Sequence, residues 1–433
     1  MPPLADPTAP AVSDAPLGRQ LLAWADALAV HSDPGFAERG ELAVTYLRAA
    51  HRAVSAQLQR WMRDDAGFDQ VHEDALGNVI ALYEGTDPAS PRLLVGSHFD
   101  TVRNAGRYDG RLGIFAPMLA VRELARAGRR LPFGLELVSI AEEEGQHFQA
   151  GGLLGASALI GAFDPAWLDV TDDDGVTLAE ALHGAGLDPA GIPATARDPA
   201  RYRGWLELHI EQGPVLATRG VPLGVVTAIN GAVRWAATVQ GEPCHAGTTP
   251  MDARRDAAAA AAEMVLAVEA AAQASPGIVA TVGMLEVPGG SINVVPGRCR
   301  FSIDMRAPSD AQRDEALASL RTTLRSIAAR RGVVLDLQET MRVAAAPCDA
   351  RLRQRCADAV ATLGLPMLEL PSGAGHDAMV LGRVMPQAML FVRGGHRGIS
   401  HSPRETVDAA DAELAVRALL AWLEAEAREA GTA

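Results

Sequence analysis

Histidine, aspartate and glutamate gather in five short segments, each near a place where a strand is expected to end. The segments are GSHFDTV (96–102), GRYDGRLG (106–113), AEEEGQHF (141–148), LELHIEQGP (206–214) and GISHSPRE (398–405). Imidazole and carboxylate groups without thiolates are typical ligands of zinc, manganese, cobalt or nickel. Two such cations about 3.5–4 Å apart need one bridging carboxylate. The pattern therefore favours metal-assisted hydrolysis.

The adjacent residues Glu143 and Glu144 suit two different roles in such a reaction. Neighbours in a strand or its terminal turn point in different directions, so one can bind metal while the other faces the substrate and accepts a proton. Each segment alone also fits ordinary structure: a core histidine, a solvated glutamate face, or an aspartate in a turn. The hypothesis rests on all five segments occurring in one chain.

The elements that must position these residues alternate between helix and strand. Apolar, β-branched runs predict buried strands, and longer amphipathic runs predict helices. The expected helices are 18–31, 41–64 and 113–128, and the expected strands are 77–83, 92–97 and 134–141. This order predicts an α/β domain with a mostly parallel sheet flanked by helices. Functional residues of such sheets gather at the carboxyl ends of the strands, where His98 and Glu143 fall.

The pattern changes after a strand expected at 222–230. Four strands and two helices then predict a compact α+β domain inserted into the first: strands 233–240, 278–287, 298–305 and 333–338, and helices 252–274 and 308–331. The expected organisation is a disordered, proline-rich tail (1–17), the first part of a catalytic domain (18–225), the insert (226–340) and the second part of the catalytic domain (341–433).

Composition excludes several functional classes. The chain has 433 residues and a net charge of −14, which argues against nucleic acid or an anionic membrane as a partner. All 39 basic residues are arginines, so Schiff-base and P-loop lysine chemistry is excluded. The four cysteines form no CxxC pair, and neither a signal peptide nor a membrane-spanning stretch is expected. We expect a cytoplasmic protein.

Longer motifs resemble one family of enzymes. ELHIEQGPVL, GEPCHAGTTPMDARRDA, VVPGRCRFSIDMR, PSGAGHDAM and GISHSPRE are similar to the hydantoinase/carbamoylase amidases. That family belongs to the clan of dinuclear metallohydrolases that includes carboxypeptidase G and aminoacylase. The resemblance runs from about residue 18 to the end. It implies a zinc-aminopeptidase-like catalytic domain and an inserted domain that acts as a lid and forms a homodimer.

The resemblance also implies roles for individual residues. Two divalent cations per subunit are expected, zinc or manganese, with nickel or cobalt as other options. One would be held by His98, Asp109 and His209, and the other by Asp109, Glu144 and His401, with Asp109 bridging. Glu143 would be the general base, and Asp100 would orient His98 through its second nitrogen.

In the inserted domain, His245, Asn293 and Arg306 resemble residues that face the substrate. Arg306 would grip a substrate carboxylate, while His245 and Asn293 would stabilise an oxyanion. Without the resemblance, Arg306 is read as a structural salt bridge and His245 as part of a capped loop. Gln212 and His376 are further candidates for substrate contact. One departure is His147, where many relatives carry arginine, and it bears on the choice of substrate.

Two segments, GSHFDTVRNAGRYDGRLGI and AEEEGQHFQAGGLLGASALIG, resemble allantoate amidohydrolases more than carbamoylases. The expected reaction is hydrolysis of allantoate to ureidoglycine, ammonia and carbon dioxide. The alternative is an N-carbamoyl-L-amino acid hydrolase or β-ureidopropionase, since both substrate types carry a carboxylate and a terminal ureido group. More distant alternatives are a metallopeptidase or deacylase of the same clan, and a non-catalytic metal-binding protein.

Overall fold

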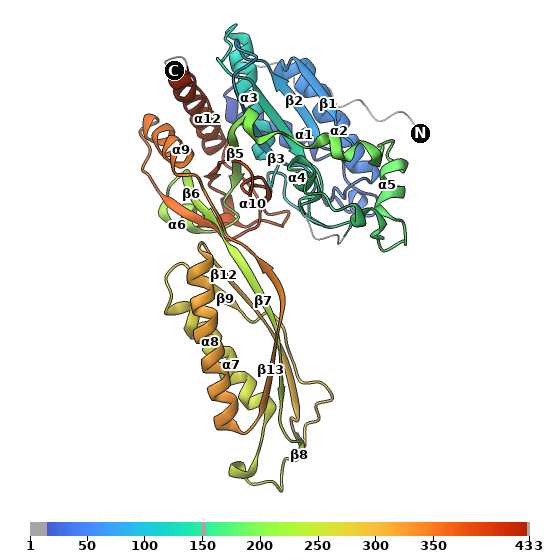
Figure 1. The fold of residues 1–433 in the computed structure, drawn as a ribbon, viewed down its shortest axis with the longest axis vertical. Coiled ribbons are helices and arrows are strands. Elements are labelled where there is room, and N and C mark those ends of the chain that lie inside the picture. Colours follow the sequence, from blue (N-terminus) through green and yellow to red (C-terminus); the bar gives the residue numbers. More distant parts are fainter. Residues whose placement is uncertain (1–14, 149–152, 431–433) are drawn as a thin grey trace. The chain divides into compact units, whose positions relative to one another are not determined.

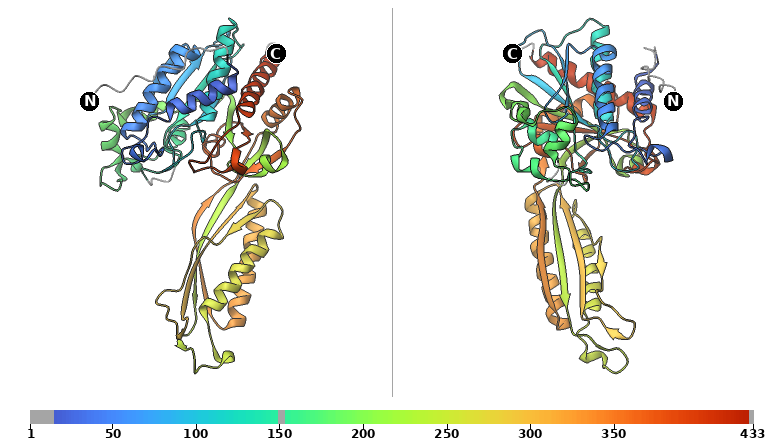
Figure 2. Two further views of the ribbon diagram at one scale, coloured as in Figure 1. Left: turned by 180° about the vertical axis from the view of Figure 1, so that it is seen from behind. Right: turned by 90° about the vertical axis from the view of Figure 1, so that its right-hand side faces the viewer.

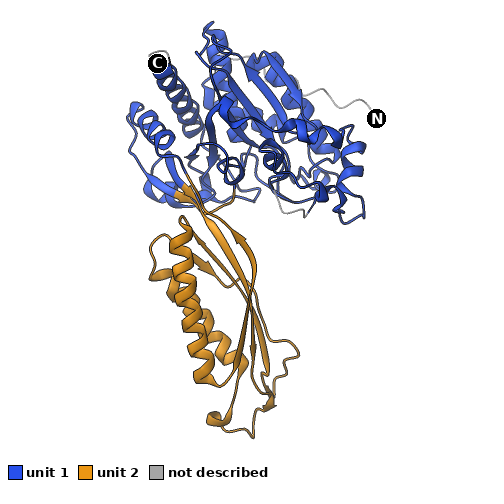
Figure 3. Ribbon diagram, viewed as in Figure 1, with its two compact units in different colours: residues 1–227, 348–370, 376–433 blue, residues 228–347, 371–375 orange. Residues whose placement is uncertain are grey.

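The computed structural model describes residues 15–148 and 153–430, which form two compact units (Figure 3). The first unit comprises Met1–Thr227, Cys348–Leu370 and His376–Ala433, and the second comprises Ala228–Pro347 and Pro371–Gly375. Up to residue 14, the predicted tail lies outside the described residues. No helix within the described ranges is long and apolar enough to cross a membrane.

A nine-stranded sheet organises the first unit, in the order β1-β2-β4-β3-β5-β16-β6-β14, with β15 also paired to β6. The four central strands β4, β3, β5 and β16 are parallel neighbours, whereas β2 and β6 pair with them antiparallel. This confirms the predicted α/β class. The strands are β1 (Gln70–Glu73), β2 (Val79–Tyr83), β3 (Arg92–His98), β4 (Leu135–Ile140), β5 (Tyr202–Ile210), β6 (Leu223–Ile229), β14 (Ala346–Pro347), β15 (Glu369–Ser372) and β16 (Gln387–Val392).

Helices flank this sheet (Figure 1). α3 packs against β3, β4 and β5, and α1 and α12 pack on α3 and on each other, so that one large apolar core forms between helices and sheet. The helices are α1 (Leu17–Leu28), α2 (Ala49–Trp61), α3 (Leu112–Arg126), α4 (Leu154–Leu159), α5 (Leu178–Gly184), α6 (Val215–Arg219), α9 (Ala350–Thr362), α10 (Ala378–Leu381), α11 (Gly395–Gly398) and α12 (Ala409–Ala430).

The helix predicted for 41–64 is shorter in the structure, where α2 begins at Ala49. The residues before it are not helical, because some of their backbone groups bond to other segments. Thr101 donates its amide N–H to the Val44 carbonyl at 3.1 Å, and Asp33 donates to Ala43 at 2.8 Å. These long-range hydrogen bonds override the local helical pattern.

The second unit is an α+β sandwich with a separate apolar core. Its five-stranded sheet has the order β10-β12-β7-β13, with β9 also paired to β12. Both helices lie on one side of the sheet (Figure 2, left). The elements are β7 (Gly231–Gln240), β8 (Cys244–His245), β9 (Val279–Thr281), β10 (Leu285–Glu286), β11 (Val294–Val295), β12 (Arg298–Ala307), β13 (Val334–Val343), α7 (Ala257–Gln273) and α8 (Asp310–Arg331).

Side chains of β12 alternate between buried and more exposed positions, as expected for a sheet covered by helices on one face. Where four strands were predicted, the sheet has five, because the stretch predicted as one strand (278–287) is divided into β9 and β10. The two short strands pair with different parts of β12, at Asp304–Arg306 and at Arg300–Phe301, so the chain bends between them.

Candidate metal centre

The sheet of the first unit places two histidines at the same edge. His98 is the last residue of β3, and His209 is next to the last residue of β5, its parallel neighbour. The loop after β3 then carries Asp109 to this edge, just before α3. The arrangement follows from the parallel topology, because the carboxyl ends of the central strands meet at one edge.

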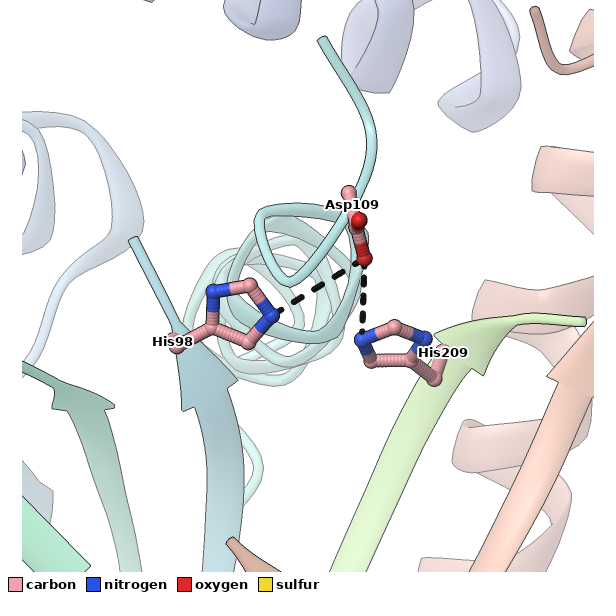
Figure 4. A group of neighbouring side chains, drawn as sticks. All are labelled: His98, Asp109 and His209. Atoms are coloured by element: carbon pink, nitrogen blue, oxygen red, sulfur yellow. Dashed lines mark ion pairs between the residues drawn. The ribbon is translucent and has the colours of Figure 1, made fainter. Parts of the chain in front are cut away.

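Figure 4 shows the first group, His98, Asp109 and His209, whose side chains converge. Asp109 Oδ1 lies 3.8 Å from His98 Nε2 and 3.4 Å from His209 Nε2. His98 Nδ1 lies 3.1 Å from the Asp100 carbonyl, and His209 Nδ1 lies 2.9 Å from the Ile210 carbonyl. A carbonyl only accepts, so each Nδ1 carries the proton and each Nε2 presents a lone pair to the carboxylate.

The second group is Asp109, Glu144 and His401. His401 Nε2 lies 3.1 Å from Asp109 Oδ2 and 3.5 Å from Glu144 Oε1. Asp109 therefore turns Oδ1 towards one group and Oδ2 towards the other. This is the arrangement that a carboxylate needs in order to bridge two cations.

Unpaired atoms support a metal centre here. Asp109 Oδ1 and Glu144 Oε1 are buried and have no hydrogen-bond partner among the described residues. Lone pairs on imidazole nitrogens and carboxylate oxygens repel one another unless a proton or cation lies between them. Buried polar atoms are rarely left without a partner, so nitrogen and oxygen donors converging in this way fit divalent cations.

The pKa shifts of the candidate ligands are also consistent with a metal centre. Burial lowers the pKa of His98 to about 4, so its ring is neutral at pH 7. Burial, with the charge on Asp109, raises the pKa of Glu144 to about 8. Burial also opposes ionisation of Asp109, but the hydrogen bond from His401 holds its pKa below the ordinary value. Bound cations would favour the ionised forms of both carboxyl groups.

Glu143 stands beside both groups. Its Oε2 lies 3.9 Å from His98 Nε2, and His98, Glu143 and Glu144 form a further potential ligand group. Burial and the nearby acidic groups, Asp377 foremost and then Glu144, raise the pKa of Glu143 well above its ordinary value. A carboxyl group tuned in this direction suits proton transfer near neutral pH.

Asp100 contacts this centre in two ways. Its backbone carbonyl holds His98 Nδ1, while its carboxylate lies farther away, at 3.8 Å. The carboxylate instead accepts the amide N–H groups of Glu143 at 3.2 Å and Glu144 at 3.0 Å. Asp100 therefore positions the loop that carries both glutamates, in addition to orienting the His98 ring.

Gln212 and His376, predicted as substrate contacts, both lie in the first unit near the ligand groups. Gln212 Nε2 donates to Asp109 Oδ2 at 2.9 Å. His376 is buried and packs edge-on against His209 with 4.5 Å between ring centroids. It also forms a potential ligand group with Glu207 and His209.

His245, Asn293 and Arg306 belong to the second unit. His245 pairs with Val294 of β11, and Asn293 directly precedes that strand, where its carbonyl accepts the Ala246 amide N–H at 2.9 Å. Arg306 lies on β12, where its Nε donates to Asp304 Oδ1 at 2.8 Å and its Nη1 to the Gly373 carbonyl at 2.9 Å. The structure thus places His245 and Asn293 together and Arg306 on a separate strand.

His147 holds the glutamate loop to its surroundings. Its Nδ1 lies 2.6 Å from the Tyr46 carbonyl, and its Nε2 lies 2.9 Å from Asp172 Oδ2. The ring therefore ties the loop that carries the glutamates to the segments of Tyr46 and Asp172.

Sequence reasoning overlooked Ser400 and Glu405. Ser400 Oγ lies 3.2 Å from Asp109 Oδ2, and Glu405 accepts the Asp109 amide N–H at 3.1 Å. Both residues lie in the GISHSPRE segment, so their proximity to His401 in the sequence was the available signal.

Fold and site together define a hydrolytic enzyme of the α/β class. A family model described as Peptidase family M20/M25/M40 matches residues 94–425. An N-carbamoyl-L-amino acid amidohydrolase of Geobacillus stearothermophilus is 39% identical over 357 residues, covering 82% of this chain and 86% of the relative. A probable allantoate deiminase of Oryza sativa subsp. japonica is 36% identical over 430 residues, covering 91% of this chain and 86% of the relative.

A solved structure of a hydantoinase/carbamoylase family amidase from Burkholderia multivorans has a TM-score of 0.87 and 31% identity, covering 95% of this chain and 98% of that one. The chain therefore belongs to Peptidase family M20/M25/M40, which confirms the resemblance read from its motifs. Within that family it is similar to the amidases, and it is an enzyme that hydrolyses C–N amide bonds.

Proposed function

We propose that this enzyme hydrolyses the terminal ureido group of a small carboxylate, with allantoate as its substrate. The observation that carries the proposal is the position of Asp109, whose two oxygens face different ligand groups while Glu143 lies beside both. One water is consumed: its oxygen bonds to the ureido carbon, and the C–N bond to the terminal nitrogen breaks, which releases ammonia and leaves a carbamic acid. The carbamic acid then loses carbon dioxide, which breaks the second C–N bond and frees the amine.

We assign two cations, zinc or manganese, to the two groups that share Asp109. The donors are nitrogen and oxygen atoms, which suit these metals. When bound, the cations supply acidity to the attacking water and polarise the ureido carbonyl. Glu143 accepts the proton of the water and passes it to the leaving nitrogen, a contribution of about 10²- to 10⁴-fold in rate.

The second unit supplies substrate contacts in this proposal. Arg306 exchanges its present partners, Asp304 and the Gly373 carbonyl, for the substrate carboxylate, which a guanidinium binds through two parallel hydrogen bonds. His245 and Asn293 donate to the oxygen on which negative charge develops. Exposed apolar residues of this unit support a homodimer formed through it, among them Met284, Leu285 and Ile292.

The test is ammonia release from allantoate by metal-reconstituted protein, beside a panel of N-carbamoyl-L-amino acids. Glu143→Gln should retain its metal and lose at least about 100-fold in turnover, because it removes the proton acceptor. Glu144→Gln is the matched control, which should lose bound metal instead. Full activity of Glu143→Gln, or no ammonia from any ureido compound by fully metallated protein, would contradict the proposal.

N-carbamoyl-L-amino acids are the second candidate substrates. The Geobacillus amidohydrolase, with 39% identity, favours them, whereas the longer match to the rice deiminase, over 91% of this chain, favours allantoate. Both carry a carboxylate and a terminal ureido group, so the same residues serve either. Release of an L-amino acid, with allantoate inert, would move the substrate to this second candidate and leave the residue roles unchanged.

A further inference from the structure

Glu405 connects two segments that are far apart in the sequence and carry different parts of the centre. Its side chain is buried, with 4% exposure. Oε1 accepts the amide N–H groups of Tyr108 at 2.8 Å and Asp109 at 3.1 Å, and Oε2 accepts the Ser400 hydroxyl at 2.7 Å. Glu405 thus ties the segment of the bridging aspartate to the segment that carries His401.

The backbone around Glu405 is shaped to admit its carboxylate. A Cβ at Gly106 would lie 2.2 Å from Glu405 Oε1 and 2.4 Å from Glu405 Cβ. Such distances are well below van der Waals contact, so only glycine fits at this position. The backbone at Gly106 therefore packs directly against the Glu405 side chain.

The Ser400 hydroxyl has one proton and two carboxylates within reach. It lies 2.7 Å from Glu405 Oε2 and 3.2 Å from Asp109 Oδ2, so the shorter contact, to Glu405, takes the proton. Asp109 Oδ2 already accepts Gln212 Nε2 at 2.9 Å, whereas His401 Nε2, 3.1 Å from the same oxygen, would turn a lone pair to the cation when metal is bound and would not donate to Asp109. A carboxylate oxygen has about two lone pairs, so one remains for a cation only if Ser400 does not donate to it.

We propose that Glu405 is a positioning residue that keeps Asp109 Oδ2 available as a metal ligand by holding the proton of the Ser400 hydroxyl. Glu405 touches neither substrate nor cation. It acts through Ser400 on the group formed by Asp109, Glu144 and His401. The inference rests on the metal centre of the proposed function and adds a residue that makes Asp109 able to bridge.

Glu405→Gln tests this inference with little change of shape. The amide oxygen still accepts both backbone N–H groups, but the amide nitrogen is a donor and now points its proton at Ser400 Oγ. The serine proton then turns to Asp109 Oδ2 and competes with the cation. We expect the second Mn²⁺ to bind about tenfold more weakly, the effect of about one hydrogen bond, while the first binds as in the wild type.

A second substitution separates this role from a purely structural one. Ser400→Ala in the wild-type background should leave both Mn²⁺ affinities unchanged, because the hydroxyl does not serve Asp109 there. In the Glu405→Gln background, Ser400→Ala should restore the second affinity, since no hydroxyl remains to compete. If Glu405 served only to hold the two segments together, the double variant would bind Mn²⁺ as weakly as Glu405→Gln, or more weakly.

The measurement is equilibrium dialysis of the full chain against Mn²⁺ alone, with metal counted by elemental analysis and folding checked by circular dichroism. Rescue in the double variant supports the inference. Absence of rescue, a tenfold loss in Ser400→Ala alone, or a single Mn²⁺ in the saturated wild type would overturn it. The readout uses no substrate, so wild type that binds two Mn²⁺ and hydrolyses no ureido compound contradicts only the proposed function.

Discussion

At the scale of single residues, His51 shows how completely the interior of the first unit excludes water. The ring is fully buried, and neither nitrogen has a hydrogen-bond partner among the described residues. It stacks on Phe99 with 4.5 Å between ring centroids and meets Tyr46 edge-on. Burial lowers the pKa of His51 from 6.5 to about 3. The residue therefore serves as a neutral aromatic ring.

The burial of His51 predicts that the free energy of unfolding falls as the pH is lowered. Below pH 6.5 the unfolded chain protonates His51 while the folded chain does not until about pH 3, so acid favours unfolding through this residue. His51→Phe keeps the ring and removes the titration. Between pH 6.5 and about pH 5, the wild type should lose about 2 kcal/mol of unfolding free energy relative to the variant. Urea unfolding at several pH values measures this, and parallel curves for the two proteins would contradict it.

At the scale of elements, three loops that carry the site contain a non-glycine residue in left-handed backbone. Glu142, Gln212 and His401 all have positive φ, at 59°, 57° and 53°. Non-glycine residues adopt this region only where surrounding structure holds them there, and such positions gather at functional sites. Glu142 directly precedes the predicted base Glu143, Gln212 is a predicted substrate contact, and His401 is a predicted ligand. The geometry of these loops therefore sets where the side chains point.

Gly398 fixes the closest approach between two of these loops. Its φ is 74°, and a Cβ there would lie 1.6 Å from the Gly213 carbonyl oxygen. Gly398→Ala should therefore force apart the loops of Gln212 and His401, with a loss of stability of at least about 2 kcal/mol and a fall in turnover.

Gly175→Ala is the matched control, because Gly175 has a φ of 78° with nothing within 4 Å of the added Cβ. It carries the same backbone strain without the collision, and should cost about 1 kcal/mol with turnover unchanged. Urea unfolding and steady-state kinetics of the two variants separate the effects. Equal losses in both variants would show that the approach to Gly213 is unimportant.

Features that depend on local sequence could be predicted, whereas those that depend on hydrogen bonds to other segments could not. The end of β3 at His98 followed from a local pattern of buried, β-branched residues. The non-helical stretch before α2 did not, because its hydrogen bonds to Asp33 and Thr101 depend on other segments of the chain. Glu405 was missed for the same reason. The residues whose amide N–H groups it accepts, Tyr108 and Asp109, are 297 and 296 residues away in the sequence. A glutamate after a proline-containing turn otherwise indicates a solvated surface.

At the scale of the whole molecule, the two units have separate apolar cores. One core contains residues of the first unit only, such as Leu206 and Leu208. The other contains residues of the second unit only, such as Phe301 and Leu320. All predicted metal ligands lie in the first unit. A ligand that binds only the folded state stabilises the part of the protein that contains its site.

Calorimetry should therefore show two unfolding transitions, of which one responds to metal. At about 100 times the dissociation constant, Mn²⁺ should stabilise the first unit by about 3 kcal/mol, and chelation should reverse this. Leu320→Ala is the complementary change: it opens a cavity in the second core, at a cost of about 2–5 kcal/mol, and should lower only the transition that ignores metal. If chelation and Leu320→Ala moved one common transition, the units would unfold as one, and metal binding in the first would stabilise both.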